Sequence, residues 1–547
     1  MTGVPAEAVT RSSAVMAVGT AVSRLTGFVR DVVLIWAIGT GFLADTYNVA
    51  NTVPNVIFIL LAGGALNAVF VPQLVRAMKN DADGGTAFAD RLITAIGSML
   101  IVITALAVLA APWVVSAYAW SFTHSGSHAN YTVAVTFARY FLPQIFFYGL
   151  YVMLSQVLNA RGKFGPMMFT PILNNFVVIG TGIAFLVMNH NADPTTSNVT
   201  ANEIRVLGIG TTLGVVIQAL GLLPSLRRTN YRFRPRLDLR GKGLGTSYRL
   251  ATWTLLFVLV NQIAYLAVVQ IATSAGDTAA AMGFDGRGFT PYTKAYLILL
   301  LPHGVITVSV VTALLPRMSR AVADGRIDDM RADLATGLRL TGAVLVPSAV
   351  AFGVLGPSMS VLMFGHGNTS IYNAEYMGFV LSAFALGLVP FTIHNQLLRG
   401  FYAFEDTRTP VTINVWIAAT NIVLAIGCAE VLPARWVAVG LAVSYSVSYM
   451  VGVRISANRL ARRIGPLDPS VRTTYDKLVI ASVAAAVPAL AIGELAYHRW
   501  GTGQKGSLVT VIGGGLAMVV TFLIVAIFME IREVIRPIDK LLNRLGW

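Results

Sequence analysis

Long apolar runs, each bounded by glycine, proline or charged residues, recur along the whole chain. None shows the alternation of apolar and polar positions that a membrane barrel strand requires. Because hydrocarbon offers the backbone no hydrogen-bond partners, a spanning segment of this length must be a helix. The pattern predicts an all-α polytopic membrane protein with about 14 transmembrane helices, at residues 13–39, 46–75, 92–118, 132–158, 166–189, 204–226, 250–273, 291–316, 335–356, 372–398, 410–430, 435–457, 478–496 and 507–531.

Composition agrees with a membrane protein and excludes a large soluble core. Of the 547 residues, 55% are hydrophobic and only 12% are charged, and the mean hydropathy is +0.69. The N-terminal stretch MTGVPAEAVTRSS has no signal-peptide pattern, so we interpret it as mature cytoplasmic chain. Cys428 is the single cysteine, so no internal disulfide can form, and a small packing residue is the simplest reading of it.

The basic residues predict the orientation of the chain. If the N-terminus is cytoplasmic, most of the 40 lysines and arginines fall in cytoplasmic segments, which favours an even number of spans with both termini inside. The net charge of +15 is then topogenic and does not indicate nucleic-acid binding. The most basic loop, residues 227–249, is either a solvated topogenic loop or a contact for anionic lipid headgroups.

Two matched proline landmarks suggest an internal repeat. The sequence around Pro72 in the first half is similar to that around Pro316 in the second half, and the sequence around Pro171 is similar to that around Pro410. The two pairs are offset by nearly the same number of residues, as in a repeat. We therefore expect two six-helix lobes of equal orientation around a central cavity, with two further C-terminal helices. The predicted segments are an N-lobe at 1–226, a basic loop at 227–249, a C-lobe at 250–457, a linker with the last two helices at 458–531, and a cytoplasmic tail at 532–547.

Three charged residues stand inside the first predicted span. Arg24 and Asp31 lie two helical turns apart on one face, and Arg30 lies about a third of a turn away. An isolated charge at the bilayer centre costs ~3 kcal/mol, so such residues normally face protein or water. The alternative is that Arg30 and Asp31 merely pair and anchor the helix.

Polar residues also mark the second, seventh and eighth spans. The second has an amide stripe near Asp45, interrupted by proline and glycine, and the eighth begins near Lys294. Asparagines of this kind can simply join helices, but together the set favours a functional cavity. The predicted substrate-binding residues are Arg24, Arg30, Asp31, Asn51, Asn55, Lys294 and Gln262, and the predicted orienting or gating residues are Asp45, Pro54, Gly63, Gly64, Pro302 and Gly304.

The segment SRLTGFVRDVVLIWAIGTGFLADTYNVANTVPNVIFILLAGGALNAVFVPQL, at residues 23–74, resembles the MurJ (MviN) lipid II flippases of the multidrug/oligosaccharidyl-lipid/polysaccharide exporter superfamily. Phe169-Thr170-Pro171 and Thr409-Pro410 are also similar to family signatures. The resemblance implies a lipid-facing groove and transport of lipid-linked peptidoglycan precursor from the inner to the outer leaflet of the bacterial cytoplasmic membrane. The chain departs from the family at Phe58, Ile59 and Leu297, where members commonly have arginine, and Lys294 stands one turn before the last of these.

The implied substrate, lipid II, is an undecaprenyl-diphosphate-linked muropeptide. We expect Arg24, Arg30 and Lys294 to replace water around the diphosphate, with Asp31 holding Arg24 or Arg30 in place. Alternating access would then expose the site to each side. The expected partners are lipid II, anionic membrane lipids and the peptidoglycan-synthesis machinery. No cofactor is expected, although the membrane potential or an ion gradient can couple to a charged site.

Other transporters and one class of enzyme remain as alternatives. A flippase for another polyprenyl-linked oligosaccharide would have a similar site, whereas a cation or drug antiporter should present buried carboxylates with little fixed positive charge. A membrane enzyme acting on polyprenyl phosphates should show acidic pairs or a histidine–carboxylate set. His303 and His394 are isolated on apolar helices, so a transporter is favoured over an enzyme.

Overall fold

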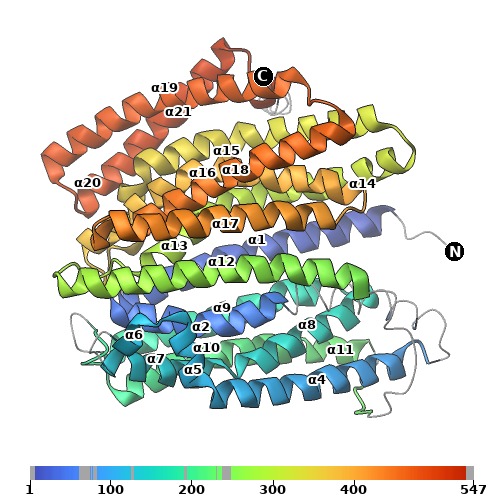
Figure 1. The fold of residues 1–547 in the computed structure, drawn as a ribbon, viewed down its shortest axis with the longest axis vertical. Coiled ribbons are helices and arrows are strands. Elements are labelled where there is room, and N and C mark those ends of the chain that lie inside the picture. Colours follow the sequence, from blue (N-terminus) through green and yellow to red (C-terminus); the bar gives the residue numbers. More distant parts are fainter. Residues whose placement is uncertain are drawn as a thin grey trace. The chain divides into compact units, whose positions relative to one another are not determined.

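A computed structural model describes residues 6–60, 74, 77, 83–124, 128–189, 194–229, 231–236 and 248–536, which are helical without strands (Figure 1). Twelve helices among these residues are long and apolar enough to cross a membrane. Helices α1 (Ala6–Ile38) and α2 (Phe42–Leu60) lie outside that set. The all-α membrane fold predicted from the sequence is confirmed, and the described helices are compatible with the predicted count of 14.

Two compact units divide the chain, Met1–Gln262 and Ile263–Trp547. In the first, the predicted runs 92–118 and 132–158 are each broken near a proline, at Ala110 and at Leu142-Pro143. Its helices after α2 are α4 (Thr86–Leu109), α5 (Ala111–Tyr118), α6 (Ser121–His124), α7 (His128–Phe141), α8 (Gln144–Ala160), α9 (Gly165–Met188), α10 (Ala201–Leu220) and α11 (Leu223–Arg228), and α12 (Tyr248–Ala281) crosses the boundary.

The second unit has longer uninterrupted helices. Two predicted runs are exceptions. In the run 291–316 a π-helical turn, η2 (His303–Thr307), follows Pro302, and in the run 507–531 a π-helical turn occupies Thr510–Gly514. The elements are α13 (Phe289–Pro302), η2, α14 (Val308–Ala323), α15 (Ile327–Phe364), α16 (Ile371–Ala403), α17 (Arg408–Val431), η3 (Ala434–Trp436), α18 (Val437–Ile464), α19 (Pro469–Trp500), α20 (Gln504–Val509), the π-helical η4 (Thr510–Gly514) and α21 (Gly515–Phe528).

Four packing arrangements of the first unit recur between corresponding helices of the second. In the first, α10 packs on α9 and α8, α2 on α7, and α4 on α8; in the second, α18 packs on α17 and α16, α13 on α16, and α15 on α16. The landmarks Pro171 and Pro410 lie in α9 and α17, and Pro72 lies outside the described residues. The shared pairings favour the predicted repeat, whereas its residue boundaries stay a prediction.

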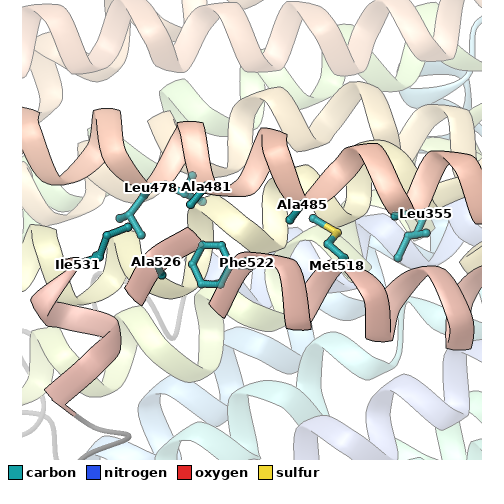
Figure 2. Packing of buried hydrophobic residues seen from close by; sticks show 10 residues of the cluster. Leu355, Leu478, Ala481, Ala485, Met518, Phe522, Ala526 and Ile531 are labelled. Carbon is teal, nitrogen blue, oxygen red and sulfur yellow. The ribbon is translucent and has the colours of Figure 1, made fainter. Parts of the chain in front are cut away.

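The last two long helices form a pair that packs on α15. Ala481, Ala485 and Ala489 repeat every fourth residue of α19 and leave room for α21 to approach closely. Met518 and Phe522 of α21 fill that space, and Leu355 of α15 completes the buried cluster (Figure 2). The residues outside the six-helix pattern are therefore part of the second unit's core.

Candidate functional site

Arg30 is the best-connected charged residue of α1. Its Nη2 lies 2.9 Å from Asp31 Oδ2, and its Nη1 donates to Asn175 Oδ1 of α9 at 3.2 Å. The Arg30 side chain is 31% exposed, and that of Asp31 is 9% exposed. The sequence allowed either Arg24 or Arg30 as the partner of Asp31, and in the structure the partner is Arg30. This ion pair is locally neutral, so Arg30 acts as an oriented hydrogen-bond donor more than as a surplus charge.

Asn175 fixes Arg30 by bonding to the same helix at two further points. Its Nδ2 donates to the Ser23 carbonyl at 3.1 Å and to the Thr26 hydroxyl at 2.9 Å. Asn175 is 4% exposed, so these bonds form away from bulk water and are strong. We name Ser23, Thr26, Arg30, Asp31 and Asn175 the Arg30 network.

Close packing of α1 on α9 makes this network possible. A Cβ added at Gly19 of α1 would lie 3.0 Å from Met168 Cβ, and one added at Gly182 of α9 would lie 3.1 Å from Val33 Cγ1. Larger residues at either position would therefore push the two helices apart. Asn175 was not predicted as a site residue; its only signal in the sequence is an amide pair, with Asn174, inside an otherwise apolar span.

Arg30 retains unused hydrogen-bonding capacity. Its Nε is buried and has no hydrogen-bond partner among the residues that the structure describes. Arg24, six residues earlier on the same helix, has an exposed side chain. The first unit thus presents one paired and one exposed guanidinium on α1, which is an arrangement that can bind an anion.

The amide stripe of α2 bonds mainly within the first unit. Asn55 Nδ2 donates to the Asn51 carbonyl at 2.7 Å, and Tyr148 of α8 donates to Asn55 Oδ1 at 3.4 Å. Asn51 Oδ1 is buried without a partner in the described part of the chain, and Asp45 is 3% exposed. Pro54 lies inside α2, which continues through it as an α-helix. Gly63 and Gly64 lie outside the described residues.

Two further predicted residues lie in α12 and α13. Gln262 is half-buried, and its Oε1 is a buried acceptor without a partner among the described residues. Lys294 is half-buried in α13. The structure therefore brings Arg30 and Asp31 together, joins Asn51 to Asn55, and leaves the roles of Gln262 and Lys294 as predictions.

The predicted hinge in the eighth span coincides with the π-helical turn. Pro302 ends α13, and Gly304 lies inside η2. His303 Nδ1 lies 3.0 Å from the Thr392 hydroxyl of α16, and its ring packs on Phe391. His394 is 3% exposed and bonds to Ser456. Both histidines are held by neighbouring helices, as expected for packing residues. A π-helical turn is rare and is often found at functional sites.

Comparison with known proteins extends these observations to the whole chain. The sequence model described as "Lipid II flippase MurJ" matches residues 35–529. The chain is 27% identical over 460 residues to a "Probable lipid II flippase MurJ" of Haemophilus influenzae, covering 81% of this chain and 84% of the relative. It is 28% identical over 403 residues to the "Lipid II flippase MurJ" of Burkholderia cenocepacia, covering 73% and 74%.

Solved structures show the same fold. The structure titled "Lipid II flippase MurJ, inward closed conformation" matches with a TM-score of 0.73 at 19% identity, covering 94% of this chain and 98% of that chain. An inward-facing multidrug-resistance MATE transporter of the MOP superfamily matches with a TM-score of 0.62 at 14% identity, covering 81% and 98%. With the family sequence model matching most of its length, the chain belongs to the lipid II flippase MurJ family.

Proposed function

We propose that the protein is a flippase that moves lipid II from the inner to the outer leaflet of the bacterial cytoplasmic membrane by alternating access. The family match over residues 35–529 carries this proposal. It is a transporter family, and the chain has the membrane-spanning helices that transport requires. The distribution of lysine and arginine supports an orientation with both termini in the cytoplasm.

The Arg30 network supports a role for the first unit in binding the diphosphate. Moving a diphosphate through hydrocarbon without replacing its water is prohibitive. Arg24 would contribute net positive charge, and Arg30, held by Asp31 and Asn175, would contribute directed donors. Because one guanidinium is already fixed before the substrate arrives, less side-chain entropy is lost on binding.

The remaining site residues extend the proposal. Asn51, Asn55 and Gln262 would hydrogen-bond the headgroup, and Lys294 would add a point charge. Asp45, Pro54, Gly63, Gly64, Pro302 and Gly304 would orient or gate the helices. No cofactor is proposed; the membrane potential would bias a charged site by ~2.3 kcal/mol per charge per 100 mV. Anionic lipids and the peptidoglycan-synthesis machinery are the proposed partners besides lipid II.

The proposal is tested by depleting the protein in its host and measuring which leaflet holds lipid II with a probe that cannot cross the membrane. Depletion should trap lipid II in the inner leaflet, and normal delivery without the protein would overturn the proposal. Arg24→Gln should leave folding intact and reduce rescue about tenfold, because charge-assisted hydrogen bonds are worth ~1.5–3 kcal/mol. Arg326→Gln, at an exposed loop residue paired with Asp324, is the matched control.

A further inference from the structure

A short basic segment of the first unit is hydrogen-bonded at both ends to helix α4. Residues 231–236, YRFRPR, lie after α11 and have no regular secondary structure. At the start, the Tyr231 hydroxyl donates to Asp90 Oδ1 at 2.7 Å; at the end, the Arg236 backbone N–H donates to the Thr94 hydroxyl at 3.1 Å. Asp90 and Thr94 are one turn apart on the same face of α4. The segment therefore runs along the first turns of α4 in a fixed register.

The anchor at Tyr231 is built from several groups. Tyr231 is 3% exposed, and the Arg161 guanidinium carbon lies 4.9 Å from the centre of its ring. Arg161 Nη1 also donates to the Thr229 carbonyl at 3.0 Å, just before the segment. Burial, together with the bond to Asp90, raises the pKa of the Tyr231 phenol well above its ordinary value, so the hydroxyl stays protonated and donating.

The arginine side chains of the segment are exposed. Arg232, Phe233, Arg234, Pro235 and Arg236 are all exposed, and Phe233 is 45% exposed. The segment contains three arginines and no carboxylate. None of the ion pairs found within the described ranges uses these arginines. Pro235 removes one backbone donor and restricts the chain to extended conformations.

Helix α4 places this segment beside lipid. Its most apolar 18-residue stretch has a mean hydropathy of 2.6, and only 11% of that stretch is buried. Beyond the second turn it exposes large apolar side chains such as Met99, Val102 and Leu106. A helix that is both apolar and exposed faces acyl chains, and Asp90 and Thr94 lie in its first three turns, where the apolar stretch begins. The arginines therefore lie at the depth of the headgroups.

We propose that residues 232–236 form a binding site for the phosphate groups of anionic phospholipids. Arginine suits phosphate because its planar fork gives two parallel hydrogen bonds. Phe233 would insert beside the headgroups, where aromatic side chains are favoured. The charge distribution assigns this surface to the inner leaflet. The site is separate from the Arg30 network and holds a lipid that is bound and not transported. It rests on the part of the proposed function that names anionic lipids as partners, and it gives that partnership its residues.

The test measures lipid preference with the purified full chain in vesicles of phosphatidylcholine containing phosphatidylglycerol. Spin-labelled lipids report the association constant of phosphatidylglycerol relative to phosphatidylcholine. The variant Arg232→Gln/Arg234→Gln/Arg236→Gln should lose a tightly held phosphatidylglycerol population, with affinity falling about fivefold per arginine. An unchanged population would overturn the proposal.

Three further measurements make the result specific. The control variant Arg326→Gln/Arg331→Gln/Arg472→Gln removes three arginines that are engaged in ion pairs, and it should leave the phosphatidylglycerol population intact. An equal loss would show that only total charge matters.

Tyr231→Phe keeps every charge but removes the hydrogen bond to Asp90, and it should weaken phosphatidylglycerol binding severalfold. Unchanged binding would contradict an ordered site. Displacement by millimolar inorganic phosphate as readily as by phosphatidylglycerol would indicate a free-phosphate site instead.

Lipid II translocation in the same vesicles separates this inference from the proposed function. The triple arginine variant should translocate lipid II while its phosphatidylglycerol preference is lost. If the unaltered protein fails to translocate lipid II but retains that preference, the proposed function fails and the lipid site stands.

Discussion

Helix α1 carries charge, whereas α12, which opens the second half of the chain, carries amides at the middle of its span. Arg30 of α1 depends on Asn175 from α9, and this contact fixes α1 on another helix. Asn261 of α12 donates instead to the Phe257 carbonyl of its own helix at 2.9 Å. A buried charge requires partners that its own helix cannot fully supply, while an amide can be satisfied locally. Charge in α1 therefore specifies helix packing as well as ligand chemistry.

The largest expected effect comes from removing the charge in α1. Arg30→Ala leaves the Asp31 carboxylate buried without its countercharge, which should lower the free energy of unfolding by about 3 kcal/mol. Asn261→Ala should cost only about 1 kcal/mol, because it loses one bond to its own helix. Thermal unfolding of the purified protein in detergent measures both.

A double substitution then separates stability from transport. Arg30→Leu/Asp31→Leu replaces the pair with apolar groups, which is often neutral for stability, and should regain most of what Arg30→Ala loses. It should still fail to translocate lipid II. Equal losses of stability in Arg30→Ala and Asn261→Ala would contradict the difference between the two helices.

A second comparison uses two asparagines at the same register of the repeat. Asn175 follows Pro171 by four residues, as Asn414 follows Pro410, and both are buried. Asn175→Ala removes three hydrogen bonds, one of them to a charged group, and should cost about 2 kcal/mol. Because Arg30 also loses its fixed orientation, lipid II translocation should fall about tenfold. Asn414→Ala should lower stability without this loss of transport, and equal transport in the two variants would contradict a positioning role for Asn175.

The second and the eighth predicted spans differ in the helix that follows their proline. Pro54 is followed by regular α-helix in α2, whereas Pro302 is followed by the π-turn η2. Pro302→Ala removes the clash with the preceding turn and should let residues 303–307 regain α-helical bonds. Hydrogen exchange of these amides should slow about tenfold, and transport should fall severalfold if η2 is a hinge. Pro54→Ala should change exchange less; a faster exchange in Pro302→Ala would refute this account.

The sequence predicted the helices because their signal is local, but it predicted contacts poorly. Apolar length marks each span, and a charge inside a span indicates an interior face. From helical spacing alone, either Arg24 or Arg30 could pair with Asp31. The conformation of the long arginine side chain determines which of them does, and the sequence does not show that conformation. Asn175 lies far along the chain from Arg30, so no periodicity relates them. Proline and glycine marked the position of η2, but their spacing does not reveal a π-turn.

The smallest expected effect concerns the start of α17, compared with the start of α9. Four residues before the repeat proline, the second unit has Asp406, whereas the first has Met167, whose carbonyl accepts from Tyr151 at 2.7 Å. Asp406 accepts from the Thr409 N–H at 2.9 Å and the Thr409 hydroxyl at 2.7 Å, and lies 3.1 Å from Arg463. Burial raises the pKa of the Asp406 carboxyl, but these bonds and Arg463 outweigh it and lower the pKa below its ordinary value.

A lowered pKa fixes the sign of the pH dependence. The stabilisation from Asp406 is complete above the unfolded pKa of about 3.9, and it is lost as the pH falls through the lower folded pKa. Asp406→Asn should therefore cost about 1 kcal/mol at pH 7, as for loss of a helix cap, and the difference from the unaltered protein should shrink towards pH 3. Unfolding temperatures measured from pH 7 to pH 3 test this. If the two curves stay parallel, the carboxylate charge does not stabilise the start of α17, and the two units begin these helices by equivalent, uncharged means.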